Sequence, residues 1–147
     1  MKTAILYYST HHGNTKKLLD AIAEKHDVTL VDITQPIPIS LEEYDLIGFA
    51  SGIYFSKFQK MLLQFAEQDL PLKKKVFFLY TCGAEKKGYT SAIRKAVLGR
   101  DAEILGEYGC LGFDTYGPFK LIGGIAKGHP NQDELEGAVK FYESILN

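Results

Sequence analysis

Short apolar runs alternate with longer amphipathic stretches along most of the chain. Residues 4–8, 45–50 and 76–80 are nearly continuous apolar runs, as expected of strands buried on both faces of a sheet. Residues 28–32 and 103–110 contain more polar positions, so we expect them to form the two edge strands. Strands separated by helical patterns are typical of a parallel sheet with crossover helices. The pattern therefore predicts five strands.

Four helical stretches are predicted between and after these strands, each with one apolar stripe at spacings of three or four residues. The stripes are Thr15, Leu18, Leu19 and Ile22; Phe58, Met61, Leu62 and Phe65; Ile93, Ala96 and Val97; and Leu135, Ala138, Val139 and Tyr142. Residues 130–133 are expected to begin the last helix. Between the second and third strands, Pro36 and Pro38 each remove a backbone donor and restrict the preceding residue. That crossover is therefore expected to be a loop or a single turn.

The composition is that of an ordinary soluble globular protein. The 147 residues include 46% hydrophobic residues, enough for one core, so we expect a single domain over residues 1–147. No apolar run approaches the roughly 20 residues of a membrane helix, and the first eight residues do not resemble a signal peptide. We expect a cytoplasmic protein without membrane insertion.

Cys82 and Cys110 are too few for a disulfide framework or a thiolate zinc site, so free thiols and no metal are expected.

Charge is unevenly distributed along the chain. Residues 1–50 carry 4 basic and 7 acidic side chains, residues 51–100 carry 10 and 3, and residues 101–147 carry 3 and 8. The lysines of the middle third lack the aromatic interleaving of a nucleic-acid module, so no nucleic-acid partner is expected. Two interpretations stay open: a solvated face, or a docking patch for an anionic ligand or an acidic partner.

Residues 8–15 carry the clearest chemical signal. Their sequence, YSTHHGNT, places hydroxyl side chains and a glycine between the first strand and the first helix. Backbone N–H groups at the start of a helix attract anions, and Gly13 allows a ligand to approach the backbone closely. The nucleoside-triphosphate loop and the dinucleotide fingerprint do not fit, because the Gly-Lys-Ser/Thr run and the three closely spaced glycines are absent. The remaining interpretation is a site for a single terminal phosphate, such as that of FMN.

This segment resembles the FMN phosphate loop of flavodoxins, in which Ser and Thr residues precede Gly-Asn-Thr at the start of the first helix. Residues 45–54 are similar to the third strand and the first flavin loop of that family, and residues 80–83 to the fourth strand and the start of the second flavin loop. The resemblance extends over essentially the whole chain. It implies a doubly wound α/β fold, a five-stranded parallel sheet in the order 2-1-3-4-5, with the ligand at the carboxyl ends of the strands.

The function that the resemblance implies is FMN-dependent electron transfer, with no catalytic side chain assigned. Gly52 would turn its carbonyl toward the flavin, and Tyr54, Phe55 or Tyr89 would stack on the ring. The residues after the fifth strand would close its outer edge. The candidate cofactor-binding residues are Ser9, Thr10, His11, Gly13, Asn14, Thr15, Ser51, Gly52, Ile53, Tyr54, Phe55, Thr81, Cys82, Gly83, Tyr89, Gly112 and Phe113.

Departures from the family pattern leave alternatives open. His11 and His12 make the phosphate loop one residue longer, more like the flavodoxin-domain proteins related to protoporphyrinogen dehydrogenase. Lys57, Lys86 and Lys87 lie where family flavodoxins are usually acidic, and they are expected to raise the reduction potential of a bound flavin. An FMN-dependent oxidoreductase of the protoporphyrinogen dehydrogenase type and a flavin-free interaction module are the alternatives. Redox partner proteins, an acidic one included, and a monomer or weak dimer are expected.

Overall fold

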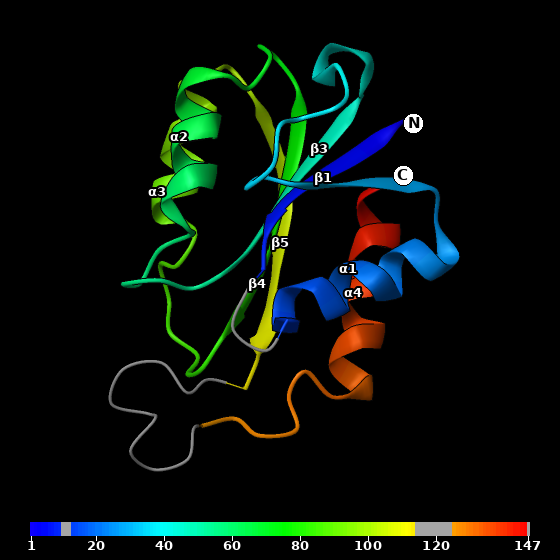
Figure 1. Cartoon of the computed structure of the whole chain (residues 1–147), viewed down its shortest axis with the longest axis vertical. Coiled ribbons are helices and arrows are strands. Elements are labelled where there is room, and N and C mark those ends of the chain that lie inside the picture. The colour runs from blue at the N-terminus through cyan, green and yellow to red at the C-terminus, as the bar shows by residue number, and fades with distance from the viewer. Residues whose placement is uncertain (10–12, 114–124, 147) are drawn as a thin grey trace.

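The computed structural model describes residues 1–9, 13–113 and 125–146. Five parallel strands form one sheet in the order β2-β1-β3-β4-β5, with helices packed on both faces (Figure 1). The predicted fold class and strand order are therefore confirmed. The strands are β1 (Thr3–Tyr8), β2 (Val28–Asp32), β3 (Leu46–Gly52), β4 (Lys75–Cys82) and β5 (Glu103–Leu111).

The helices are α1 (Asn14–Lys25), α2 (Lys60–Gln68), α3 (Ser91–Leu98) and α4 (Gln132–Ile145), with a single 3₁₀ turn, η2 (Leu41–Glu43), between β2 and β3. Helices α2 and α3 cover one face of the sheet, and α1 and α4 cover the other (Figure 1). The short crossover before β3 agrees with the prediction from the two prolines. No described helix is both long enough and apolar enough to cross a membrane.

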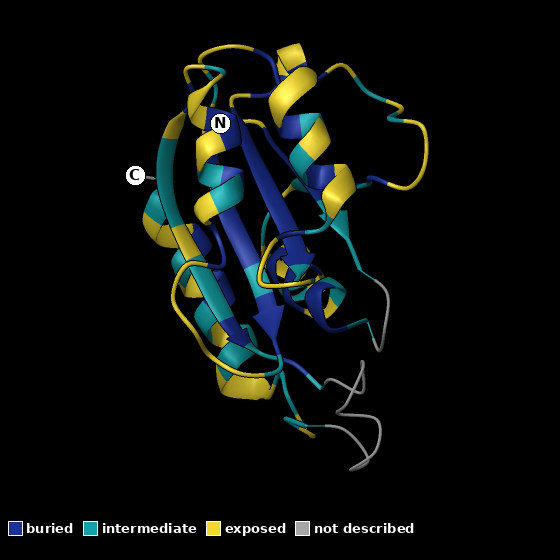
Figure 2. Ribbon diagram, turned by 90° about the vertical axis from the view of Figure 1, so that its left-hand side faces the viewer, coloured by how far each residue is buried: buried dark blue, intermediate teal, exposed yellow. Residues whose placement is uncertain are grey.

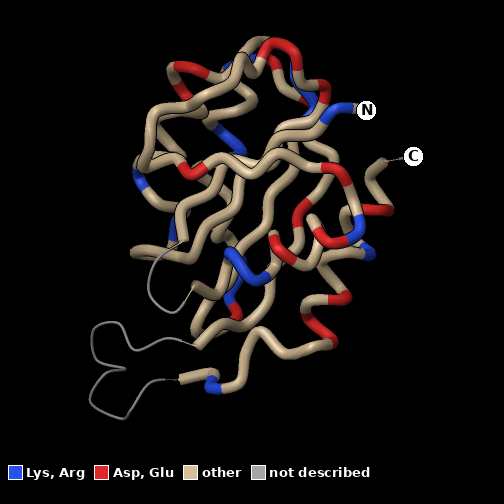
Figure 3. The backbone as a smooth tube through the Cα atoms, turned by 45° about the vertical axis from the view of Figure 1, so that its right-hand side comes forward, with Lys and Arg blue, Asp and Glu red and all other residues tan. Residues whose placement is uncertain are grey.

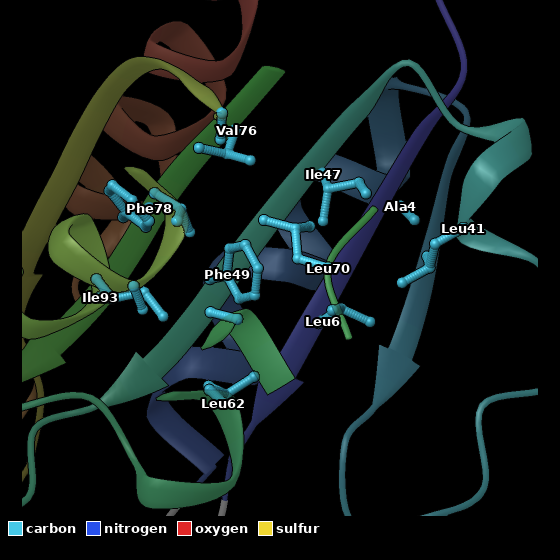
Figure 4. Close-up of a cluster of buried hydrophobic side chains, with 14 of the residues drawn as sticks. Ala4, Leu6, Leu41, Ile47, Phe49, Leu62, Leu70, Val76, Phe78 and Ile93 are labelled. Atoms are coloured by element: carbon cyan, nitrogen blue, oxygen red, sulfur yellow. The ribbon is translucent and has the colours of Figure 1, made fainter. Parts of the chain in front are cut away.

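Side chains of the central strands alternate between two apolar clusters, one on each face. Figure 4 shows the cluster under α2 and α3, where Leu6, Phe49 and Phe78 from three strands meet Leu62 and Ile93 from the helices. The intervening strand positions face α1 and α4 and form the second cluster. The middle of the sheet is therefore buried on both sides, whereas the outer surfaces of the helices are exposed (Figure 2).

The predicted stripe of the second helix is partly wrong. Phe58 is buried but lies before the helix, and Met61 is 38% exposed. The helix begins later because the side chain of Gln59 caps it, accepting a hydrogen bond of 2.6 Å from the backbone N–H of Met61. Phe58 instead packs edge-on against Phe78, with ring centroids 6.1 Å apart, so it anchors the loop that precedes the helix.

Gly48 lies in the centre of β3 at a point where no side chain fits. A Cβ atom there would lie 2.4 Å from the ring of Phe77 on the neighbouring strand. We expect Gly48→Ala to lower the free energy of unfolding by roughly 1–3 kcal/mol, because the ring must move within a packed core. Urea denaturation measures this loss. Gly52→Ala is the control, since its Cβ would meet nothing closer than 3.6 Å; equal stability of the two variants would contradict the packing argument.

Candidate functional site

The carboxyl ends of three neighbouring strands bring the predicted loops to one edge of the sheet. Tyr8 of β1 pairs with Ser51 of β3, and Gly52 of β3 pairs with Thr81 of β4. The segments that follow these strands therefore leave the sheet side by side. Thr10 and His11, which the sequence marks as candidates, lie outside the described residues, and so does His12.

The segment before α1 has the properties of an anion site. Gly13 has a φ of 65°, which L side chains rarely adopt, and a Cβ there would meet no atom within 4 Å. The backbone N–H of Lys16 donates to Ser9 Oγ at 3.1 Å, so the hydroxyl of Ser9 keeps a proton that it can donate. The first turn of α1 contains no acidic residue and carries Lys16 and Lys17 instead. Positive charge at a helix N-terminus is unfavourable unless an anion lies nearby.

Asn14 links this segment to the end of β5. Its Nδ2 donates to the backbone carbonyl of Phe113 at 2.7 Å, whereas its buried Oδ1 has no partner within the described part of the chain. Gly112 is required for this approach, because a Cβ there would lie 2.8 Å from Asn14 Nδ2. The structure therefore brings the predicted residues Gly112 and Phe113 to the N-terminus of α1.

Thr15 links the same segment to β4. The hydroxyl oxygens of Thr15 and Thr81 lie 2.9 Å apart and both side chains are buried. One hydroxyl donates to the other, so one proton of the pair remains for a third group. The sequence indicated both residues as cofactor-binding candidates but gave no sign that they contact each other, because they are 66 positions apart.

The segment between β3 and α2 forms a tight turn. The backbones of Tyr54 and Lys57 exchange hydrogen bonds of 2.8 and 3.1 Å. Phe55 and Ser56, between them, have φ values of 50° and 65°, as a type I′ turn requires. The side chain of Phe55, at the tip of the turn, is 84% exposed.

The base of this turn is fixed by Ser51. Its fully buried hydroxyl donates to the carbonyl of Gly52 and accepts from the backbone N–H of Gln59 at 3.1 Å. Tyr54 packs edge-on against Tyr8, with ring centroids 5.8 Å apart, and Ile53 packs against the core on the α2 and α3 face. The Ser51 hydroxyl therefore links the two ends of the segment that contains the turn.

Aromatic side chains connect this turn to the segment after β4. Tyr80 lies edge-on to Phe58 at 6.2 Å on one side and to Tyr89 at 5.7 Å on the other, measured between ring centroids. The hydroxyl of Tyr89 donates to the carbonyl of Ala84 at 2.7 Å, and the residue is only 8% exposed. Tyr89 therefore supports the segment from within, whereas Phe55 presents its ring to the surface. Gly83 follows β4 in a half-buried position.

An open pocket of about 380 Å³ lies beside the segment after β4. Its lining combines the ring of Tyr80 with polar and charged groups, and it extends over β5, where Gly109 leaves room for that ring. The lining residues are Tyr80, Cys82, Glu85, Lys86, Lys87 and Gly109.

The two cysteines are free, buried and on opposite faces of the sheet. Cys110 belongs to the cluster under α1 and α4, whereas strand alternation places Cys82 on the same face as Tyr80. The thiol of Cys82 donates to the backbone carbonyl oxygen of Cys110 at 3.5 Å, and the two sulfur atoms form no disulfide. Burial raises the pKa of Cys82 to about 11 and that of Cys110 to about 12.

The parallel order of the strands and the three loops at one edge define a protein of the flavodoxin-like α/β class. A family model described as a flavodoxin domain matches residues 5–110, and the chain therefore belongs to the flavodoxin-domain family. An uncharacterized protein of Methanocaldococcus jannaschii, MJ0298, is 42% identical in an alignment of 148 positions that covers 99% of each chain.

Solved structures of flavodoxins share the fold at low sequence identity. A flavodoxin from the domain Archaea matches with a TM-score of 0.68 and 17% identity over all of both chains. Flavodoxin 2 from Bacillus cereus matches with a TM-score of 0.68 and 18% identity, over 99% of this chain and 98% of that one. General stress protein 14 from Treponema denticola, solved in complex with FMN, matches with a TM-score of 0.65 and 14% identity, over 99% and 98%.

The buried thiols should react slowly in the folded protein. At pH 8 a thiol with a pKa of about 11 is ionised to about one part in a thousand, against roughly a tenth or more for an ordinary thiol. We expect the reaction of Cys82 and Cys110 with Ellman's reagent at pH 8 to be at least about a hundredfold slower in native than in urea-unfolded protein.

The same pKa shifts predict a loss of stability at alkaline pH. The folded state holds the thiol protons more tightly than the unfolded chain. The resulting contribution to the free energy of unfolding is complete below about pH 9 and is lost as the pH rises toward 11 and 12.

For the reaction with Ellman's reagent, equal thiol reactivity of native and unfolded protein would contradict the burial of both thiols.

The Thr15–Thr81 hydrogen bond should appear as a coupling between the two residues. Thr15→Val or Thr81→Val alone leaves a buried hydroxyl without its partner and is expected to cost roughly 1–3 kcal/mol of unfolding free energy. The double variant should cost clearly less than the sum of the two single losses, because no hydroxyl is then left unsatisfied. Urea denaturation of the four proteins in the absence of flavin measures the coupling, and strictly additive losses would show that the bond contributes nothing.

Proposed function

We propose that this protein binds FMN at the carboxyl edge of the sheet and transfers electrons through it. The proposal is supported by one observation: β1, β3 and β4 end at the same edge of the sheet, beside the N-terminus of α1, whose first turn contains no acidic residue. Bound flavin would supply the redox chemistry, by taking up and returning electrons. The chain contributes binding, exclusion of water and electrostatics.

The residues before α1 suit a terminal phosphate. Gly13 leaves its backbone open to a ligand, and the first turn of α1 offers N–H groups and no competing carboxylate. Lys16 and Lys17 add positive charge at the same place, although Lys16 also pairs with Asp20 at 2.7 Å. Ser9 can donate the proton that its hydrogen bond from Lys16 leaves available. These groups would neutralise and orient the phosphate.

Asn14 suits another part of the same ligand. Its unpartnered Oδ1 is an acceptor, so it would receive a hydrogen bond from a hydroxyl rather than bind a phosphate oxygen. The ribityl chain of FMN carries such hydroxyls next to its phosphate. A buried acceptor of this kind costs stability while it is unsatisfied, so the ligand would remove that cost.

The two other loops suit an aromatic ring. The turn after β3 presents Tyr54 and Phe55, and the segment after β4 presents backbone from Cys82 and Gly83. Gly52 lies at the junction, where an added Cβ would meet only ordinary contacts. The stacking of Tyr54 or Phe55 on the ring, and the closing of its outer edge by Gly112 and Phe113, are parts of the proposal. Tyr89 would act by supporting the loop.

Gly13→Val tests the binding site. The β-branched side chain is strained at a φ of 65° and would fill the space that the phosphate needs. We expect FMN affinity, measured by fluorescence quenching on titration, to fall by at least about a hundredfold, which corresponds to roughly 3 kcal/mol.

Gly128→Val is the matched control for Gly13→Val. Gly128 also has a positive φ, 81°, and open space around its Cβ position, but lies outside the proposed phosphate site. It should keep the affinity of the unmodified protein. A colourless protein that ignores added FMN would instead favour the flavin-free interaction module, while the fold would stand.

The lysines near the proposed flavin should raise its reduction potential. A unit charge about 8 Å from a reduced, anionic flavin stabilises it by roughly 0.5–2 kcal/mol at effective dielectric constants between 80 and 20. We therefore expect the triple variant Lys57→Gln, Lys86→Gln, Lys87→Gln to have a lower midpoint potential in a spectroscopic redox titration. The control replaces Lys25, Lys75 and Lys95 with Gln. An unchanged potential in the first variant would disprove the electrostatic effect.

The same redox titration separates an electron carrier from an oxidoreductase. A carrier takes up its two electrons in two resolved steps, whereas an enzyme that reduces or oxidises a substrate by two electrons takes them up in one. The oxidoreductase of the protoporphyrinogen dehydrogenase type remains the second candidate, and the open pocket beside Lys86 and Lys87 is the observation that favours it.

A further inference from the structure

Four lysines surround the two loops that border the proposed flavin. We call this set the basic rim: Lys57, Lys60, Lys86 and Lys87. All four are exposed, and none forms an ion pair with another residue of the described ranges. Glu85 is the one acidic residue in segments 52–60 and 83–88, so these segments together carry a net charge of +3 (four lysines less one glutamate).

Aromatic contacts hold the two loops that carry these lysines next to each other. Phe58 and Tyr89 both pack edge-on against Tyr80, at centroid distances of 6.2 and 5.7 Å. Lys57 is the direct neighbour of Phe58, and Lys87 precedes Tyr89 by two positions. The two groups of lysines, about 30 positions apart in the sequence, therefore belong to loops that lie next to each other at the carboxyl edge of the sheet.

The charge of this surface is local. The whole chain has a formal net charge of −1, so the basic rim is not the consequence of a basic protein. Figure 3 shows acidic residues in several places, among them α4, which packs beside α1 on the face of the sheet opposite α2 and α3. Within α4, Glu134 lies near the carboxyl edge, where it accepts a hydrogen bond of 3.2 Å from the backbone N–H of Leu111. The positive charge is therefore a property of the two loops of the basic rim, and a local field of this kind orients an approaching partner of opposite charge.

An apolar centre accompanies the charges. Phe55 is 84% exposed at the tip of the turn that also carries Lys57. Protein interfaces commonly combine an aromatic centre with a polar rim. A small metabolite would not need four exposed lysines spread over two loops, whereas a protein surface can contact all of them at once.

We propose that the basic rim docks an acidic one-electron carrier protein, whose redox centre lies beneath a carboxylate-rich surface. The inference rests on the proposed function, since docking here would place the partner's centre beside the flavin. In each encounter a reduced partner docked here would lose one electron to the flavin. Two encounters, with protons taken from water, would complete the reduction.

The test is a titration of the isotopically labelled protein with a purified acidic [2Fe–2S] ferredoxin, in which NMR chemical shifts report binding. The titration is run at about 10 mM and about 150 mM salt, each with and without added FMN. The rim variant carries Lys57→Gln, Lys60→Gln, Lys86→Gln and Lys87→Gln. The matched control carries Lys25→Gln, Lys75→Gln, Lys95→Gln and Lys140→Gln, which remove the same charge from exposed positions away from the rim. A basic c-type cytochrome and a short DNA duplex are the comparison ligands.

We expect the ferredoxin to bind the unmodified protein and the control variant within twofold of each other, and the rim variant at least about tenfold more weakly. Binding should weaken as salt rises, because exposed charges are screened. Equal binding of the two variants, tighter binding of the cytochrome, or rim-dependent binding of DNA in preference to ferredoxin would each overturn the proposal. The experiment without FMN keeps this outcome separate from the proposed function: docking can be seen if flavin fails to bind, and flavin binding can be seen if docking fails.

Discussion

Parallel pairing of β1, β3 and β4 in the middle of the sheet determines where the candidate site lies. Because the three strands run in the same direction, the loops that follow them leave from one edge. Both faces of these strands are covered by helices, so their register cannot shift without exposing one apolar cluster or the other. The place where the loops converge is therefore as fixed as the core.

Buried polar contacts and aromatic packing then hold the loops together. Asn14 connects the start of α1 to the end of β5, and Thr15 connects it to β4. Tyr80 lies between the loops that follow β3 and β4. Each contact uses a side chain whose partner is distant in the sequence. A ligand that bound here would meet a largely preorganised surface, which lowers the entropic cost of binding.

Much of the fold could be predicted because burial leaves a periodic pattern in the chain. The five strands, the central position of residues 4–8, 45–50 and 76–80, and the short crossover at Pro36 and Pro38 follow from local rules. The start of α2 could not be predicted in this way, because Phe58 is buried by a loop rather than by a helix and the cap at Gln59 decides where the helix begins. Hydrophobic periodicity indicates that a residue is buried, but it does not show whether that residue lies in a helix or in a loop.

The order of residues along the chain is enough to predict the class of fold, the phosphate-loop candidate around Gly13 and the excess of lysine in the middle third, because hydrophobic pattern, side-chain chemistry and charge can all be read locally. Other properties are visible only in the folded molecule: the contact of Thr15 with Thr81, the burial of Tyr89 beside an exposed Phe55, and the opposite faces on which Cys82 and Cys110 lie. These properties depend on strand register and on packing between distant segments, and no local pattern contains that information.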